Sequence, residues 1–513
     1  MYYNSLWPFA LREELRPAKR YAVSAYQSLC KLAREQALIG TTASALSWDQ
    51  ETQLPPAAVP YRAQQLAYLA GKSHELATSE QWQAALESAE GDLNGDPVQS
   101  ANLREFRHHF DRATKLPTEL VERATETSSR GKAAWSMARE KSEFSIFAPA
   151  LTDLLEIARE KAALWGYQEE PYDALLGEYE RGASTAEVAA LFDRFRETGA
   201  ELAQQAVENS KAVPADLLDA DYPIEDQKTL NREIAESLGF DFKAGRIDTV
   251  AHPFCTHLGP HDTRLTTRYL ERDFLSSLFG VMHEAGHGLY DQGLPEAEHG
   301  LPSGSAVSLG IHESQSRLWE NHVGRARPFW EKWLPRAAEI FPNLRTLSLD
   351  DFLGGVNRAE YSCIRVEADE ATYDLHILMR FSLERRLLNR ELEVADVPEA
   401  WDSEFESLFG FRPPDDAHGC LQDIHWSMGG LGYFSTYSIG NLNAAQLYAK
   451  ATEDEAIASA CEQANYAPIL QWMQEHVHAA GSTLFPQELM ESATGERTNP
   501  EYYLSHLRRR FVG

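Results

Sequence analysis

The 513-residue sequence has few cysteines, and their arrangement argues against a disulfide framework. The five cysteines are Cys30, Cys255, Cys363, Cys420 and Cys461. They are odd in number, far apart and never spaced as C-x-x-C, so we expect reduced thiols that mostly fill the core. Thiols of this kind are typical of a reducing compartment, which favours the cytoplasm.

The sequence also lacks an excess of positive charge and any long apolar run. Lys plus Arg number 48 against 78 Asp plus Glu, for a formal net charge of −30. Nucleic acids and anionic membranes attract positive surfaces, so neither is an expected partner. No stretch of about 18 apolar residues is long enough to span a bilayer. The start, MYYNSLWPFALREELRP, lacks the basic region and apolar core of a secretory signal.

No repeat, low-complexity tract or long Gly/Ser linker interrupts the chain, and most of it has helical spacing. Residues 143–167 place apolar residues at helical intervals and end near Gly166, a suitable C-cap. Residues 184–210 begin with a capping pattern, because Glu187 lies three residues after Ser184.

The composition and the position of loop-like segments indicate the domain organisation. Apolar residues make up 43% of the chain and charged residues 25%, as in ordinary globular proteins. The most loop-like segment is 211–227. We expect a single domain over 1–513, with a helical half at about 1–225 and a second half at 226–513.

Residues 245–270 have a different pattern, with β-branched residues and turn signals that predict two short strands. A sheet here would directly precede the helix described next, and its edge strand would suit an extended peptide. The alternative is a hairpin that faces solvent.

The stretch GVMHEAGHGLY belongs to a predicted helix at roughly 272–292, closed by Gly293. His283 and His287 are four residues apart, so their rings project from successive turns of one face and can bind one Zn²⁺. Glu284 is offset by about 100°, which removes it from the ligand set but leaves it within reach of a metal-bound water. This is the arrangement of H-E-x-x-H, with two ligands and a general base.

The alternative is an amphipathic helix with two ordinary polar histidines. Two features favour the metal. The flanking residues are strongly apolar, which predicts a helix buried on much of its surface, where an unpaired His–Glu–His cluster is costly. Gly286 and Gly288 lower helix propensity by about 1 kcal/mol each, which is understandable if something approaches closely.

A catalytic zinc ion needs a third protein ligand. Residues 308–322 read as a second helix that offers Glu313, 26 residues after His287. His312 and Glu320 are alternative third ligands. Alternatively, Glu313 is an ordinary helix residue that faces solvent and binds no metal.

Several motifs in order resemble the carboxypeptidase Taq family of metallocarboxypeptidases. They are HPF (252–254), DTRLT (262–266), HEAGH (283–287), HESQS (312–316), IRVEAD (364–369) and GCLQDIHW (419–426). N-terminal stretches such as WDQETQLPPAAVPYRAQQLAYLAGKSHE (48–75) resemble the family too, although LPPA departs from its Met-Pro pattern. The resemblance covers nearly the whole chain.

The resemblance implies a mainly α, large, two-lobed peptidase fold similar to neurolysin and angiotensin-converting enzyme, with a deep central groove and a small β-sheet near the active site. It implies release of C-terminal residues from peptides with a free C-terminus, and a homodimer. The implied ligands are His283, His287 and Glu313, with Glu284 as the base. Zn²⁺ is the expected metal for a His₂Glu set, with Co²⁺ as an alternative.

The resemblance and the chemistry together suggest the remaining roles. The oxyanion needs donors besides the metal, and we expect His425 with one tyrosine, Tyr437 rather than Tyr433. Arg365 is expected to bind the substrate carboxylate, because its fork matches two oxygens.

Four further residues have supporting roles in this hypothesis. Arg264 and Asp262 are predicted to brace the strand segment, with a direct substrate contact as the second reading. Gln422 and Asp423 are expected to orient His425 or a ligand. The alternative role for Arg365 is a structural one, an ion pair with Asp369 within one helix, and this pair is compatible with substrate binding.

Two other functions stay open from the residues alone. One is an endopeptidase or oligopeptidase on the same scaffold, which would not need a free C-terminus. The other is a non-enzymatic helical peptide-binding protein, against which the complete set His283, Glu284, His287 and Glu313 argues.

Overall fold

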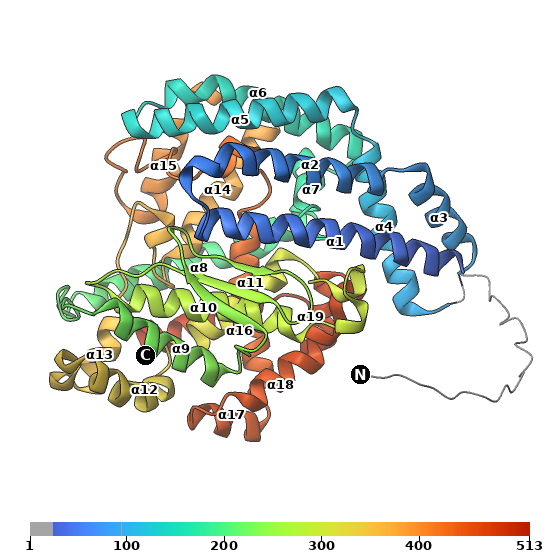
Figure 1. The fold of residues 1–513 in the computed structure, drawn as a ribbon. Helices are drawn as coiled ribbons and strands as arrows, with labels where there is room; N and C mark the ends of the chain where they lie inside the picture. The colour runs from blue at the N-terminus through green and yellow to red at the C-terminus, as the bar shows by residue number, and fades with distance from the viewer. Residues whose placement is uncertain (1–23, 94) are drawn as a thin grey trace, which may run out of the picture.

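The computed structural model describes residues 24–93 and 95–513, and the described chain is mainly helical with one small sheet (Figure 1). The mainly α prediction is confirmed. The N-terminal stretch in which no secretory signal was expected lies outside the described residues. All five cysteines are free thiols, as expected. In the part of the chain that is described, no helix combines the length and apolar character needed to cross a membrane.

The first half of the chain forms helices, most of them long, that occupy the upper part of Figure 1, with α8 crossing the middle. Their bounds are α1 Ala25–Thr52, α2 Val59–Ala77, α3 Glu80–Gly91, α4 Pro97–Thr114, α5 Thr118–Lys141, α6 Phe144–Trp165, α7 Pro171–Leu176 and α8 Thr185–Ser210. The helix end and the helix start predicted from the sequence are confirmed. Gly166 ends α6 at a φ of 87°, and the side chains of Ser184 and Glu187 form the capping box of α8.

The second half adds the lower part of the molecule and returns to the upper part through α14 and α15. The bounds are α9 Ile224–Leu238, α10 Phe274–Gly293, α11 Leu309–Arg317, α12 Arg327–Ile340, α13 Leu349–Val356, α14 Tyr373–Leu388, α15 Val397–Phe409, α16 Ser435–Ala451, α17 Glu455–Glu462, α18 Ala467–His476, α19 Pro486–Thr494 and α20 Glu501–Leu507. The helix expected at 308–322 is real, but its second half, Leu318–Val323, is π-helical.

The sheet has three strands, so the expectation of two was wrong. β1 (Gly245–Thr249) pairs in parallel with β3 (Thr263–Thr267), and β2 (Cys255–His257) pairs antiparallel on the other side of β3. β2 has only three residues, too few for an alternating pattern to be recognised in the sequence. The sheet packs against α10 through β3.

Two large hydrophobic cores correspond to the lower and upper parts of the molecule, and α16 contributes to both. Its Ala444 and Leu447 belong to the core around α10, whereas Ile439 and Leu442 belong to the core around α14. α16 also packs closely on α11. The contact requires a glycine, because a Cβ on Gly440 would lie 2.5 Å from Cγ of Glu313. The helix of the expected third ligand is therefore held at the junction of the two cores.

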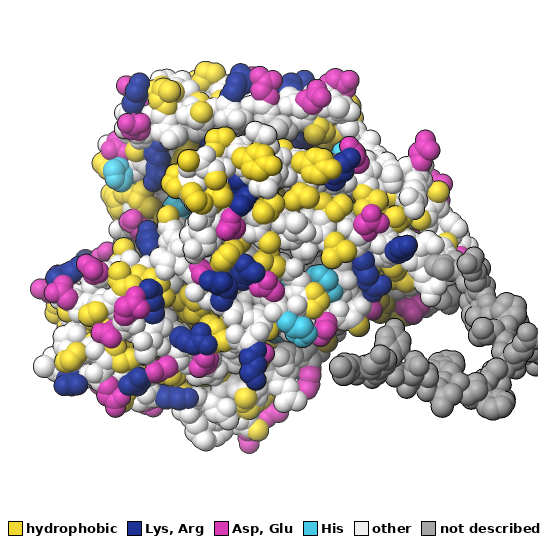
Figure 2. Space-filling model, in the orientation of Figure 1, with side chains coloured by type: hydrophobic (Ala, Val, Ile, Leu, Met, Phe, Trp, Pro, Cys, Tyr) yellow, Lys and Arg dark blue, Asp and Glu magenta, His cyan; other side chains and the backbone are white. Residues whose placement is uncertain are grey.

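The surface has charges of both signs, interspersed on the face shown in Figure 2. Hydrophobic side chains gather over α2 on that face. Tyr61 and Tyr68 of this helix are 67% and 65% exposed.

Candidate active site

α10 carries the H-E-x-x-H sequence in the middle of the lower core. Asp273 caps the helix by accepting a hydrogen bond from the backbone N–H of Ser276. Leu278, Val281 and Met282 are fully buried around the motif. The expectation of a helix buried on much of its surface is thus confirmed, and a polar cluster at this depth needs partners.

The two glycines of the motif admit other parts of the protein. A Cβ on Gly286 would lie 2.6 Å from the carbonyl oxygen of Gln315 and from Cα of Ser316, both on α11. A Cβ on Gly288 would collide with Phe240 and Leu265. The close approach expected from the glycines is therefore real, and its purpose is to bring α11 and the sheet against the histidine helix.

The three expected ligands lie together at this contact. Oε2 of Glu313 is 3.6 Å from Nε2 of His283 and 3.5 Å from Nε2 of His287. The three ligand atoms lie within 4.8 Å of one another. Bonds of about 2.0–2.2 Å to one tetrahedral ion would separate two ligand atoms by about 3.3–3.6 Å. The residues therefore fit a single divalent ion.

The other ring nitrogen of each histidine has a partner of its own. Nδ1 of His283 lies 2.9 Å from Oε2 of Glu320, and Nδ1 of His287 lies 2.6 Å from Nδ1 of His312. Nε2 of His312 is 3.2 Å from Oδ1 of Asp291. These contacts leave both Nε2 atoms directed at Glu313. The two alternative third ligands, His312 and Glu320, thus lie behind the histidines, and Glu313 lies in front of them.

Arg317 is a member of the site that the sequence analysis missed. Its Nε donates to Oε1 of Glu313 at 2.7 Å, and its NH1 donates to Oε2 of Glu320 at 3.2 Å. Burial raises the pKa of Glu313, but Arg317 and the two histidines outweigh it and hold that pKa well below its usual value. The i, i+4 spacing of Glu313 and Arg317 was the signal available in the sequence.

Glu284 lies on the same helix but outside the ligand cluster, as the helical offset predicted. Its side chain makes no hydrogen bond to another described residue, and the residue is only 6% exposed. Burial raises the pKa of its carboxyl group to about 7, with the nearby Glu313 acting in the same direction. A carboxyl group with this pKa can both accept and return a proton near neutral pH.

His425, Tyr433 and Tyr437 form one aromatic group. The ring centroids of His425 and Tyr433 are 5.2 Å apart, and those of Tyr433 and Tyr437 are 5.4 Å apart. Burial lowers the pKa of His425 to about 4, so its imidazole is neutral at neutral pH. The guanidinium carbon of Arg365 lies 5.1 Å from the ring centroid of Tyr437. Four of the predicted site residues are thus gathered on α16 and the segments beside it.

Arg365 does not pair with Asp369, so the predicted intrahelical ion pair is wrong. Its Nε and NH2 donate to Oδ1 of Asp423 at 3.1 and 2.8 Å, and its NH1 donates to the hydroxyl of Tyr373 at 2.8 Å. The reason is local: Arg365 lies in a 3₁₀ turn of three residues, Arg365–Glu367, so no α-helix connects positions i and i+4.

Gln422 and Asp423 hold Arg365 in place. Gln422 accepts a hydrogen bond from the backbone N–H of Arg365 at 2.8 Å, and Asp423 also pairs with the fully buried Arg380 at 2.6 Å. Asp423 is 4.0 Å from Nδ1 of His425. Both residues hold Arg365, and neither makes a hydrogen bond to His425 or to a proposed metal ligand, so the expectation that they orient His425 or a ligand is not confirmed.

Arg264 and Asp262 form the predicted pair at β3. Nε and NH2 of Arg264 donate to the two oxygens of Asp262 at 2.8 and 2.7 Å. The guanidinium carbon also lies 4.3 Å from the ring centroid of Trp48 on α1. The pair therefore connects the sheet with the first helix, and its contact with a substrate stays a prediction.

The fold and the site together have the composition of a metal-dependent peptidase: two histidines of H-E-x-x-H on a buried helix, a carboxylate from the next helix facing both of them, and the glutamate of the motif beside the cluster. The chain belongs to the carboxypeptidase Taq (M32) metallopeptidase family, whose family model matches residues 28–511. The resemblance noted in the sequence is confirmed.

Individual relatives agree with this assignment. The chain is 40% identical over 502 residues to thermostable carboxypeptidase 1 of Thermus thermophilus, covering 95% of this chain and 98% of the relative. It is 35% identical to carboxypeptidase 1 of Bacillus subtilis, covering 91% and 94%. The crystal structure of the M32 carboxypeptidase from Deinococcus radiodurans matches with a TM-score of 0.92 at 36% identity, covering 95% and 98%. The protein is a metal-dependent carboxypeptidase and thus a peptide hydrolase.

Proposed function

We propose that the enzyme holds one divalent metal ion between His283, His287 and Glu313. The support is the separation of 3.5–3.6 Å between the carboxylate oxygen and the two Nε2 atoms. The imidazole and carboxylate ligands favour Zn²⁺, with Co²⁺ as the alternative. The contacts of Glu320, His312 and Arg317 orient the three ligands before the metal arrives.

Peptide-bond hydrolysis follows from this arrangement. The bound ion would supply Lewis-acid polarisation of the scissile carbonyl and acidify the attacking water. Glu284 then accepts the proton of the water at its carboxylate and passes it to the leaving amine. Its burial supports the first step, because a buried carboxylate is a stronger base than an exposed one. A pKa of about 7 still allows the protonated group to give the proton up near neutral pH.

Donors from α16 and the preceding turn complete the site. We assign stabilisation of the developing oxyanion to His425 and Tyr437, with Tyr433 as the alternative tyrosine. The support is the cluster of the three rings and the guanidinium of Arg365 beside Tyr437.

Arg365 is proposed to bind the C-terminal carboxylate of the peptide. A guanidinium has five N–H donors, and Asp423 and Tyr373 receive three hydrogen bonds from it. The remaining two N–H groups of the fork match one carboxylate. Arg264, on the central strand β3, and the adjoining Asp262 are proposed to brace the sheet beside the site, with a substrate contact as a secondary role.

The direction of attack is tested with N-blocked peptides in two forms, one with a free C-terminal carboxylate and one amidated. Mass spectrometry of the products, with and without chelator, should show loss of single C-terminal residues only from the free peptides and only with metal. Equal cleavage of amidated peptides would instead favour the endopeptidase alternative.

Arg365→Lys should raise KM much more than it lowers kcat, because uniform binding is lost.

We also propose a single domain over 1–513, a cytoplasmic location and a homodimer. The location is supported by the free cysteines, and the dimer by the family resemblance. Light scattering at several concentrations tests the dimer directly.

A further inference from the structure

A cavity of about 830 Å³ lies outside the candidate active site and has an unusual lining. It is lined by four arginines and two histidines, namely Arg325, Arg327, Arg509, Arg510, His322 and His506. Among the described residues, no Asp or Glu lines it. The two histidines are uncharged at neutral pH, because burial lowers the pKa of His322 and of His506. In a chain with a net charge of −30, the four arginines gathered at one cavity mark a place for a negatively charged ligand.

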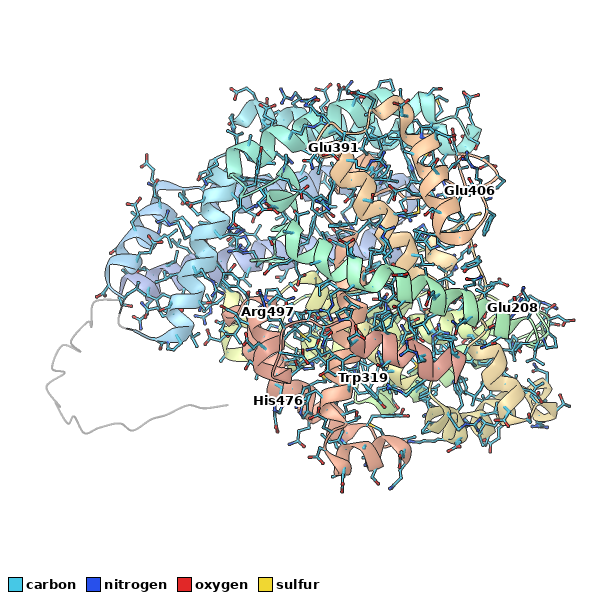
Figure 3. The ribbon with its side chains drawn as sticks, turned by 180° about the vertical axis from the view of Figure 1, so that it is seen from behind. Glu208, Trp319, Glu391, Glu406, His476 and Arg497 are labelled. Carbon is cyan, nitrogen blue, oxygen red and sulfur yellow. The ribbon has the colours of Figure 1, made fainter. Side chains whose placement is uncertain are left out.

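The cavity is built by segments that are distant in the sequence. They are the end of α8 with Asn209 and Ser210, the π-helical segment Leu318–Val323, the start of α12 and the C-terminal segment Arg508–Val512. Glu208, labelled in Figure 3, marks the end of α8, which lies beside the region of α12 and α13. None of the three proposed metal ligands lines the cavity.

Part of the positive charge is neutralised by acidic groups behind the wall. Arg510 and His506 both bind Glu370 at 2.8 Å, and Arg325 donates to Oε1 of Glu320 at 3.3 Å. Arg327 pairs with the exposed Asp350.

Arg509 has no such partner. It lies at the cavity and makes no hydrogen bond or ion pair within the described residues. The start of α12 adds to its charge, because Ala326, Arg327 and Pro328 line the cavity and no side chain caps this 14-residue helix. The N-terminus of a helix carries a partial positive charge and free N–H groups, which bind anions.

A cation is the wrong occupant, although His322, Glu370 and His506 also form a cluster of ligand-type residues. Nε2 of His506 is 2.8 Å from Oε1 of Glu370, a direct hydrogen bond. That is shorter than the separation of about 3.3–3.6 Å that two ligands of one tetrahedral ion require. Arg510 occupies the other carboxylate oxygen, so the cluster is closed against a metal.

We propose that this cavity binds a phosphate group carried by a small molecule, a function separate from peptide hydrolysis. Arg509, Arg327 and the first turn of α12 would bind the phosphate, because guanidinium forks match its oxygens. Apolar side chains from Leu353, Tyr448 and Phe511 line the rest of the cavity. A volume of this size is typical of small-molecule sites.

The test is isothermal titration of the whole metal-loaded enzyme with inorganic phosphate and with glucose 6-phosphate, at an ionic strength held constant with NaCl. Glucose is the uncharged control. Arg509→Ala removes a guanidinium that lines the cavity, and Arg508→Ala is the matched control, because Arg508 is exposed like Arg509 but does not line the cavity. Neither arginine has a partner to lose, so both variants should unfold at the wild-type temperature.

We expect saturable binding of at least one phosphate compound to the wild type and to Arg508→Ala, with affinity at least tenfold weaker in Arg509→Ala. The proposal is overturned if neither compound binds the wild type saturably. It is equally overturned if Arg509→Ala binds as tightly as Arg508→Ala, because the phosphate then binds elsewhere, such as at the metal centre.

Discussion

At the scale of single residues, the site depends on a few carboxylates with different surroundings. Glu313 is held ionised by Arg317 and the histidines, whereas Glu284 has no cationic side chain bonded to it and burial raises its pKa to about 7. Two glutamates on adjacent helices therefore have different surroundings, which suit the roles proposed for them, Glu313 as a ligand and Glu284 as a base.

Glu284→Gln should lower kcat for peptide hydrolysis by about 10²–10⁴-fold, because the proton acceptor is removed. The metal content, measured by elemental analysis, should not change, since Glu284 lies outside the ligand cluster. Glu296→Gln, at an exposed glutamate, is the control. Hydrolysis by Glu284→Gln at the wild-type rate would contradict the assigned base.

Glu320→Gln should weaken metal affinity by about 10–100-fold, as expected for the partner of a ligating histidine. The carboxylate lies 2.9 Å from Nδ1 of His283, and an amide would hold the ring less firmly. Competition with a fluorescent chelator measures the affinity, with the exposed Glu331→Gln as control. If both variants bind metal equally, the orienting role of Glu320 is wrong.

At the scale of elements, the contact of α10, α11 and α16 decides the geometry of the site. Gly286 admits the backbone of α11 on one side, and Gly440 admits Glu313 on the other. α11 is thus clamped between two helices. A further anchor is the buried Glu180, which accepts hydrogen bonds from Ser308 and from the backbone of Gly310 at the start of α11.

Gly440→Ala should lower the free energy of unfolding by about 1–3 kcal/mol, because the added methyl group overpacks the contact. It should also weaken metal binding, since the methyl group would meet Cβ and Cγ of Glu313 at 2.6 and 2.5 Å. Denaturant titration and metal competition measure the two effects. Gly40→Ala in α1 is the matched control, because nothing lies within 4 Å of its added Cβ. Unchanged metal affinity in Gly440→Ala would show that α11 adjusts freely.

Glu180→Gln tests the pH dependence of stability. Burial raises the pKa of Glu180 to about 7 from its usual value of 4.5. The native state therefore binds the proton more tightly, so this contribution to stability is complete below about pH 4.5 and is lost as the pH rises through about 7.

The Gln side chain can keep both contacts, with its carbonyl accepting from Gly310 and its amide donating to Ser308. The variant should therefore equal the wild type near pH 5 and be more stable by up to about 3 kcal/mol at pH 8. Urea unfolding at the two pH values measures the difference. An equal difference at both values would rule out titration of Glu180 as its cause.

At the scale of the whole molecule, the two hydrophobic cores meet at α16, and the proposed metal site lies at this junction. A metal ion there would connect α10 with α11, so binding should stabilise the lower core as a unit. The cationic cavity lies behind the same site, since Arg325 at its wall donates to Glu320, the partner of His283.

Removal of the metal should lower the unfolding temperature by several degrees. A ligand present at 1,000 times its Kd stabilises the native state by about 4 kcal/mol. Scanning calorimetry with and without chelator measures the shift. Glu313→Gln, which should lose the metal, is expected to show almost no shift. An equal shift in wild type and variant would place the effect outside this site.

Much of this organisation was predictable because it depends on contacts that are close in sequence. The capping box of Ser184 and Glu187, the glycine stop at Gly166 and the common face of His283 and His287 all lie within one or two helical turns. Local periodicity alone determines them. The position of Glu313, 3.5–3.6 Å from the two Nε2 atoms, was not predictable in this way, because the residues alone left three candidates for the third ligand.

The amino-acid sequence by itself thus determined the helical character, the two histidines on one face and, through resemblance, the family. Only the tertiary structure decided that Glu313 faces both Nε2 atoms while His312 and Glu320 lie behind, that Arg365 pairs with Asp423, and that arginines from two distant segments, 325–327 and 509–510, meet at one cavity. The reason is physical. These contacts join residues tens to hundreds of positions apart, and packing, rather than spacing along the chain, selects the partners.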